Sequence, residues 1–140
     1  MPSIASSRKR IGTALLDDTA IGFDLISQLT YMSAVAASGV ARDMIMEEAG
    51  QQPFRTAIYF RNVFLLVKRM GIEYTRAFQV IAQAAPTEGL RHLLLRFSGA
   101  VATGGSEADF IRAETPKVYP RYKRAGDRIL ENFVQYLKAY

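Results

Sequence analysis

Glycines divide the chain into segments whose apolar residues recur at steps of three and four. Gly39, Gly50, Gly71 and Gly104 each follow such a segment. This spacing places the apolar side chains on one face of an α-helix, and glycine is the residue that most often follows a helix end. The alternation of apolar and polar residues that indicates a strand is weak throughout. The sequence therefore predicts an all-α fold.

The turn and capping residues set the bounds of the expected helices. We expect a first long helix capped by Asp18 or Thr19, and a last helix that begins near Ser106 and is kinked or restarted by Pro116. The helices between them are expected at about 41–49, 53–70, 72–84 and 88–103. Because the connections are short, the prediction is a compact antiparallel bundle of about five or six helices with a long, kinked C-terminal helix.

The widest apolar surface belongs to the predicted helix 53–70. Its apolar residues form two adjacent stripes, one of Ala57, Phe60, Phe64 and Val67 and the other of Tyr59, Val63, Leu66 and Met70. A helix with two apolar stripes is mostly buried, so we expect this helix at the centre of the bundle. In the first helix the expected inward residues are Phe23, Ile26, Leu29, Ser33 and Ala36.

Composition narrows the class of protein. A chain of 140 residues with 49% hydrophobic residues fits one globular domain, which we expect at 18–140 after a basic segment at 1–17. The absence of cysteine excludes disulfides and thiolate metal sites. The net charge of +5 favours an anionic partner. The longest uncharged run, residues 25–41, contains five serine, threonine or glutamine residues, which makes it too polar for a convincing membrane span. We therefore expect this chain to be soluble.

Candidate catalytic and metal-binding groups are few. His92 is the single histidine, and a lone histidine on a helix is usually a surface residue. The adjacent acidic pairs Asp17-Asp18 and Glu47-Glu48 point about 100° apart on a helix, which is typical of solvated faces rather than of metal sites. No phosphate-binding loop is recognisable. The sequence predicts no catalytic residue, no cofactor, no metal and no enzyme activity.

Basic residues concentrate near the C-terminus. The segment 112–140 has seven basic and three acidic residues and so carries +4 of the net charge. Tyrosines interleave with these bases, a pattern that either binds anionic partners or forms a solvated basic face over an aromatic core. Of the anionic partners, an acidic protein is favoured first, an anionic membrane second and nucleic acid third. The candidate partner-binding residues are Arg112, Lys117, Arg121, Lys123 and Arg124.

Three stretches resemble a known family. They are GIEYTRAFQVIAQAAPTEGL from Gly71, LLLRFSGAVATGGSEADFIRAE from Leu93, and SGVARDMIMEEA from Ser38. The first is similar to the family's amphipathic helix with small alanine residues, and the second to its helix followed by a Gly-Ser turn. The third is similar to an earlier turn in which a small residue precedes glycine. Over about 18–140, this order resembles the cytoplasmic domain of the platform proteins of type II secretion and type IV pilus machines, in their archaeal and tight-adherence branches.

The resemblance implies a non-catalytic adaptor. Platform proteins of this family couple a cytoplasmic motor ATPase to the insertion of pilin subunits, and they span the membrane through segments that this chain lacks. The basic residues Arg8, Lys9 and Arg10 and the segment 121–138 then resemble juxtamembrane or linker segments at the cytoplasmic face of the membrane. The resemblance leaves open whether the domain forms a homodimer. The competing interpretation is a basic helical module that binds nucleic acid.

Overall fold

The fold is all-helical, as predicted. A computed structural model describes the backbone of residues 4–138 and the side chains of 20–118, 127, 128, 130–132 and 134–138. Within this range the helices are α1 (Ile4–Ala37), α2 (Arg42–Gly50), α3 (Ala57–Met70), α4 (Tyr74–Ala82), α5 (Glu88–Ala102) and α6 (Glu107–Lys138). The part of the chain that the structure describes contains no strand.

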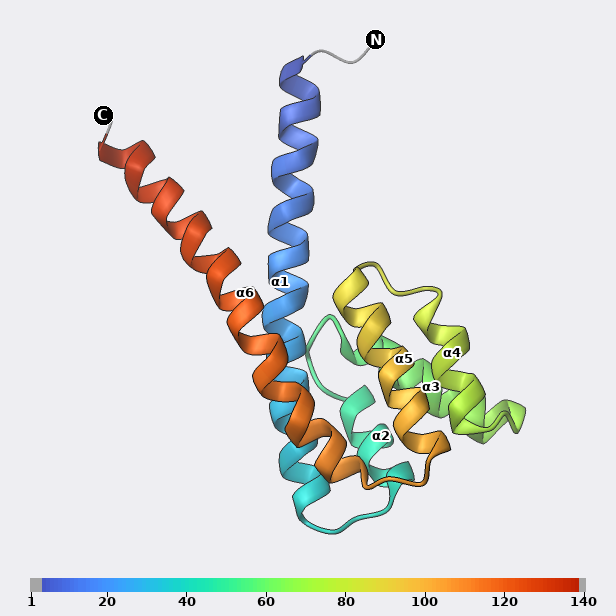
Figure 1. Cartoon of the computed structure of the whole chain (residues 1–140). Helices are drawn as coiled ribbons and strands as arrows, with labels where there is room; N and C mark the ends of the chain where they lie inside the picture. Colours follow the sequence, from blue (N-terminus) through green and yellow to red (C-terminus); the bar gives the residue numbers. More distant parts are fainter. Residues whose placement is uncertain (1–3, 139–140) are drawn as a thin grey trace.

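The helices form a closed ring in chain order. Each helix packs against the next one, and α6 returns to pack along α1 (Figure 1). The α1–α2, α3–α4 and α5–α6 turns lie at one end of the molecule, which we call the three-turn end. The start of α1 and the end of α6 project from the opposite end and diverge from each other. The predicted antiparallel arrangement is confirmed.

The core lies inside this ring. From α1 it receives Leu25, Leu29 and Met32, each no more than 1% exposed. Its aromatic part is a row of rings from three helices. Phe97 of α5 stacks on Phe78 of α4 at 4.5 Å between ring centroids and meets Phe110 of α6 at 4.8 Å. Rings at such distances add favourable quadrupole contacts to the burial of apolar area.

Two predictions about packing are wrong. The helix expected at 53–70 begins only at Ala57, and α3 packs between α2 and α4 rather than at the centre. Its C-terminal residues Lys68, Arg69 and Met70 are exposed, and Phe64 is half-buried. α5 is the more buried helix, with Leu90, Leu93, Leu94, Phe97 and Ser98 inside. The apolar stripes predicted that α3 is amphipathic, but they could not show that α3 is less buried than α5.

In α1 the inward face is rotated from its predicted position. Leu25 and Met32 point inward in place of Phe23 and Ser33, and Phe23 is 45% exposed. The helix also begins at Ile4 rather than at Asp18 or Thr19, so the predicted basic segment 1–17 is largely helical. The predicted and the observed inward faces of α1 both fit the helical period. Which of them is buried depends on where the neighbouring helices lie.

The start of α6 and its course through Pro116 bear on two further predictions. Ser106 caps the helix as expected, since its hydroxyl accepts a hydrogen bond from the backbone N–H of Asp109 at 3.3 Å. The chain then continues as one helix through Pro116 and Pro120, so a restart at Pro116 is wrong. The kink at Pro116 stays a prediction.

Candidate partner-binding surfaces

The three-turn end owes its tight connections to glycine. Gly39, Gly71 and Gly104 end α1, α3 and α5 with φ angles of 82°, 67° and 74°. A side chain is strained in this left-handed conformation, and glycine is not. The glycines that the sequence marked as helix ends at these three turns therefore act as predicted, and they bring the starts of α2, α4 and α6 together.

Charged and aromatic groups link those helix starts. Arg42 of α2 forms an ion pair with Glu107 of α6 and places its guanidinium 5.5 Å from the ring centre of Tyr74 in α4. Asp43 accepts hydrogen bonds from the Lys68 ammonium and the Tyr74 hydroxyl. The hydrogen bond from Lys68, followed by that from Tyr74, lowers the pKa of Asp43 below its usual value. Burial, and then the Asp43 carboxylate, raises the pKa of Tyr74. We call these five residues the ionic cluster.

A second polar contact fixes α6 on α5. The buried carboxylate of Glu114, 3% exposed, accepts two forked hydrogen bonds from Arg96, at 3.1 Å from Nε and 2.8 Å from a terminal nitrogen. Lys117 lies 3.5 Å from the same carboxylate. A forked arginine–carboxylate pair is geometrically specific, so it sets the position of α6 along α5.

Buried amide chemistry fixes α1 on α2 and α3. The Gln28 side chain, fully buried, donates to the backbone carbonyl of Ala49 at 2.9 Å and accepts from the Thr56 hydroxyl at 3.2 Å. Asp24 accepts from the backbone N–H of Arg55 at 2.8 Å. Satisfied buried polar groups specify one arrangement, because any shift would leave a desolvated group without a partner. α1 is therefore an integral part of the domain.

The structure describes the side chains of two of the five predicted basic residues. Arg112 and Lys117 have 68% and 65% of their side chains exposed, and each contacts an acidic residue of its own helix, Asp109 at 3.9 Å and Glu114 at 3.5 Å. The side chains of residues 121, 123 and 124 lie outside the described residues.

Helical register shows how the five positions divide. At about 100° per residue, positions 117, 121 and 124 fall on one side of α6, and positions 112 and 123 fall about 140° away. By register alone the five positions divide into two groups, and their role as one partner-binding surface stays a prediction.

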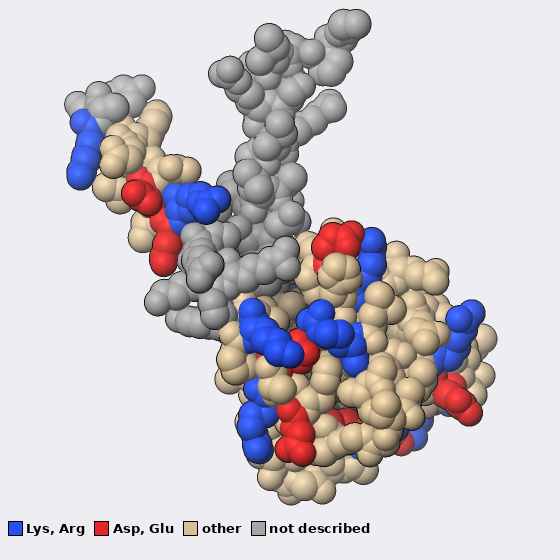
Figure 2. Space-filling view, in the orientation of Figure 1, with Lys and Arg blue, Asp and Glu red and all other residues tan. Residues whose placement is uncertain are grey.

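The domain itself presents no broad surface of one charge in the view of Figure 2. Blue and red side chains are interspersed over α2 to α5 on that face. The ion pairs of the described residues include Arg91 with Glu88 at 2.9 Å. Interspersed charge favours solubility and gives little attraction to a polyanion.

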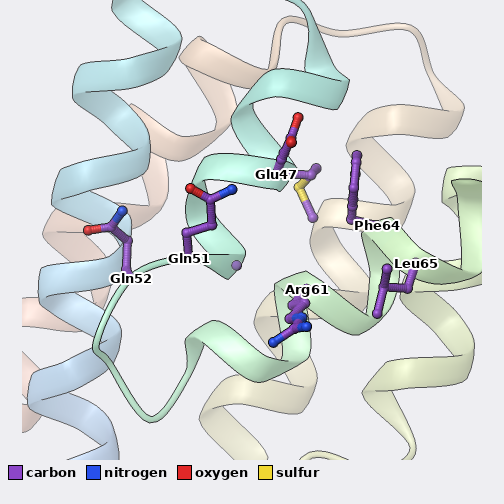
Figure 3. A pocket seen from close by; sticks show the side chains of 8 residues that line it. Glu47, Gln51, Gln52, Arg61, Phe64 and Leu65 are labelled. Atoms are coloured by element: carbon purple, nitrogen blue, oxygen red, sulfur yellow. The ribbon is translucent and has the colours of Figure 1, made fainter.

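A groove between α2 and α3 is a feature that sequence reasoning missed. Its volume is about 550 Å³, and Figure 3 shows the side chains that line it, which come from α2, from α3 and from the connection between them. Gly50 permits the close approach of the helices there, since a Cβ atom at Gly50 would lie 2.9 Å from the Arg61 Cα. The groove has both apolar and polar lining residues, which are Met46, Glu47, Gly50, Gln51, Gln52, Arg61, Phe64 and Leu65.

A second groove, of about 500 Å³, lies between α1 and α6 and is mostly apolar. Two threonines that line it, Thr30 and Thr115, donate their hydroxyls to carbonyls of their own helices, at 2.8 Å each. Their polar groups are thereby satisfied within the helix. The full lining is Thr30, Ser33, Ala34, Ala37, Arg112, Thr115 and Pro116. We call this the α1–α6 groove.

Candidate catalytic groups remain dispersed. His92 is 57% exposed, with its Nε2 at 3.4 Å from Glu88, which agrees with the surface position expected for it. Among the described residues no three histidine, aspartate or glutamate side chains gather as metal ligands would. Neither groove contains a histidine or a pair of carboxylates.

Comparison of the chain with protein-family models, with curated proteins and with solved structures gave no significant match. Within the described residues one helical stretch, Ala20–Ala37, is apolar and long enough to cross a membrane by length and composition alone. One third of that stretch, 33%, is buried inside the fold. A core helix passes the same test, so the stretch does not identify a membrane protein.

Proposed function

We propose that this chain is a non-catalytic adaptor domain of a membrane platform protein that couples a secretion motor ATPase to pilin or filament assembly. The observation that carries the proposal is the position of the chain ends. The start of α1 and the end of α6 leave the helical domain at the same end, and the domain lies at the other (Figure 1). Such a domain can be anchored to a membrane through both of its chain ends.

The segments that resemble the platform family support this proposal by their places in the fold. The stretch from Gly71 covers the α3–α4 turn, α4 and the start of α5, and the stretch from Leu93 covers the α5–α6 turn. The stretch from Ser38 covers the α1–α2 turn and α2. The Gly-containing turns on which the resemblance depends therefore meet at the three-turn end, the end most distant from the proposed membrane.

The contacts inside the domain suit an adaptor. The ionic cluster, the Arg96–Glu114 pair and the Gln28 hydrogen bonds connect all six helices, so a force applied to one surface is transmitted to the others. The energy in this proposal comes from the nucleotide cycle of the motor. Two motor states with different affinities for the domain would shift it between two positions.

The test is a pull-down of the motor ATPase of the same organism with the purified chain. We expect binding that weakens as salt rises, because exposed charges are screened over about 8 Å at physiological ionic strength. The variant Lys117→Glu, Arg121→Glu, Arg124→Glu should lose most of the motor binding. Its control, Arg112→Glu with Lys123→Glu, changes the other side of α6. Full binding by a folded triple variant would remove this side of α6 from the interface.

Nucleic-acid binding is the alternative function, and the recurrence of basic positions 117, 121, 124 and 128 along one side of α6 favours it. The same proteins should then bind a duplex oligonucleotide with a steep dependence on salt. Tight oligonucleotide binding together with no motor binding would replace the adaptor proposal.

A further inference from the structure

The outward face of α1 carries no charge beside the domain. Its exposed residues Phe23, Ser27, Thr30, Ala34 and Ala37 follow one another at steps of four and three. No charged residue occurs between positions 25 and 41. The outer face of a helix in a soluble domain ordinarily carries charged and polar residues. This face therefore resembles a surface that another helix covers.

The α1–α6 groove continues this face toward α6. Thr30, Ala34 and Ala37 belong to both the face and the groove, and Pro116 forms part of the opposite wall. Because the Thr30 and Thr115 hydroxyls are bonded within their own helices, a neighbour would leave neither of them without a partner. Short side chains also let a second helix approach closely. We propose that this face and the α1–α6 groove form the contact between two copies of this chain.

A lipid bilayer fits the same surface poorly. On its other side the same stretch of α1 supplies Leu25, Leu29 and Met32 to the core, and Gln28 bonds to α2 and α3. Moving this stretch into lipid would break those contacts. The groove is also bordered by Arg112, which is 68% exposed and would be costly to place in hydrocarbon.

Charge favours a second copy over another protein. In a two-fold contact the same surface occurs on both sides, so a charged face would meet its own charge. The uncharged face of α1 avoids that repulsion. Arg112 lines the groove, and Asp109 lies one turn before it on α6. They are 68% and 78% exposed and form only a long pair of 3.9 Å. In a two-fold contact, each of them has a residue of opposite charge available on the other copy.

The expected dimer is weak. The face from Phe23 to Ala37 spans 14 residue steps, or about 21 Å of helix. We expect so short a contact to bury less area than a standard stable interface, so association should depend on protein concentration. This inference does not depend on the proposed function, because it concerns contacts between copies of the chain and involves no motor.

Sedimentation equilibrium of the whole chain tests the contact. Wild type should show a reversible monomer–dimer equilibrium at micromolar concentrations. Ala34→Glu puts a negative charge against its own copy and should weaken association by about tenfold or more. Its matched control, Ala84→Glu, adds the same charge at an exposed turn after α4 and should leave association unchanged. A wild type that stays monomeric, or an equal loss in both variants, would overturn the proposal.

Cross-linking provides a second test that does not depend on whether the Ala34→Glu variant folds. The chain has no cysteine, so a single Ala34→Cys substitution can form a disulfide only between copies. Oxidation should give a dimer with Ala34→Cys and little with Ala84→Cys. Flotation of wild type with vesicles of phosphatidylglycerol and phosphatidylcholine tests whether the face binds a lipid bilayer instead. Vesicle binding that requires Ala34, without cross-linked dimer, would assign the face to lipid and refute the dimer.

Discussion

The two ends of the molecule have similar helical spacing and opposite surroundings. In α5, Leu90, Leu94 and Phe97 are fully buried. Near the end of α6, Leu130, Val134 and Leu137 recur at the same three- and four-residue steps, yet they are 60%, 39% and 56% exposed. Spacing decides that each segment is a helix with an apolar face, and only a neighbouring element decides whether that face is buried. The exposed α6 face is therefore one of the apolar surfaces that the fold itself does not cover.

The largest expected effect tests this difference directly. Phe97→Ala should lower the free energy of unfolding by about 3–5 kcal/mol, because it removes a fully buried ring that contacts Phe78 and Phe110. Leu137→Ala should change it by less than about 0.5 kcal/mol. Urea unfolding of both variants, followed by circular dichroism, measures the two values. Similar losses at both positions would mean that the end of α6 is packed in solution.

A second prediction concerns the contact that joins α6 to the domain. Arg96→Met leaves the buried carboxylate of Glu114 without its forked partner, and only Lys117 remains near it. Breaking a buried pair is strongly destabilising, but Arg96 is 47% exposed, so the expected cost is about 2–3 kcal/mol. Arg69→Met serves as the control, since no ion pair of Arg69 occurs among the described residues. A cost below that of the control would show that the pair does not hold α6 in place.

Local signals explain which parts of the fold were predictable. Gly39, Gly71 and Gly104 end helices through their own backbone freedom, and Ser106 caps α6 through its own hydroxyl, so a single sequence contains what is needed to place them. The inward face of α1 and the burial of α3 depend on neighbours that are distant in sequence. That is why Leu25 occupies the core in place of Phe23, and why α5 is more buried than α3.

The candidate surfaces were less predictable for the same reason. Charge density near the C-terminus selects Arg112 and Lys117, whose side chains are exposed, and their role in partner binding stays a prediction. The α1–α6 groove combines Ala34 with Pro116, more than 80 residues apart, and no local pattern links them. One local signal is the uncharged run at 25–41, which is too polar for a convincing membrane span. An exposed helix without charges in such a run would have indicated a helix-packing face.

The smallest expected effect tests the ionic cluster at the three-turn end. Asp43→Asn removes the charge that accepts hydrogen bonds from Lys68 and Tyr74. Since both Asp43 and Lys68 are nearly half exposed, we expect a loss of only about 1 kcal/mol at neutral pH. Glu47→Gln is the matched control on the same helix. It removes an exposed carboxylate that has no ion pair among the described residues, and should cost less than about 0.5 kcal/mol.

The pH dependence of that effect separates charge from packing. The pKa of Asp43 is lowered in the folded protein by Lys68 and Tyr74, so the unfolded chain binds a proton first as the pH falls. The advantage of wild type over Asp43→Asn is therefore fully present above an unfolded pKa of about 4, and is lost as the pH falls through the lower folded value. Urea unfolding of both proteins from neutral pH down to about pH 3 measures it. A difference that stays constant over this range would assign the effect to side-chain packing, and the three turns would then be held together by their glycines and by Arg42 with Glu107.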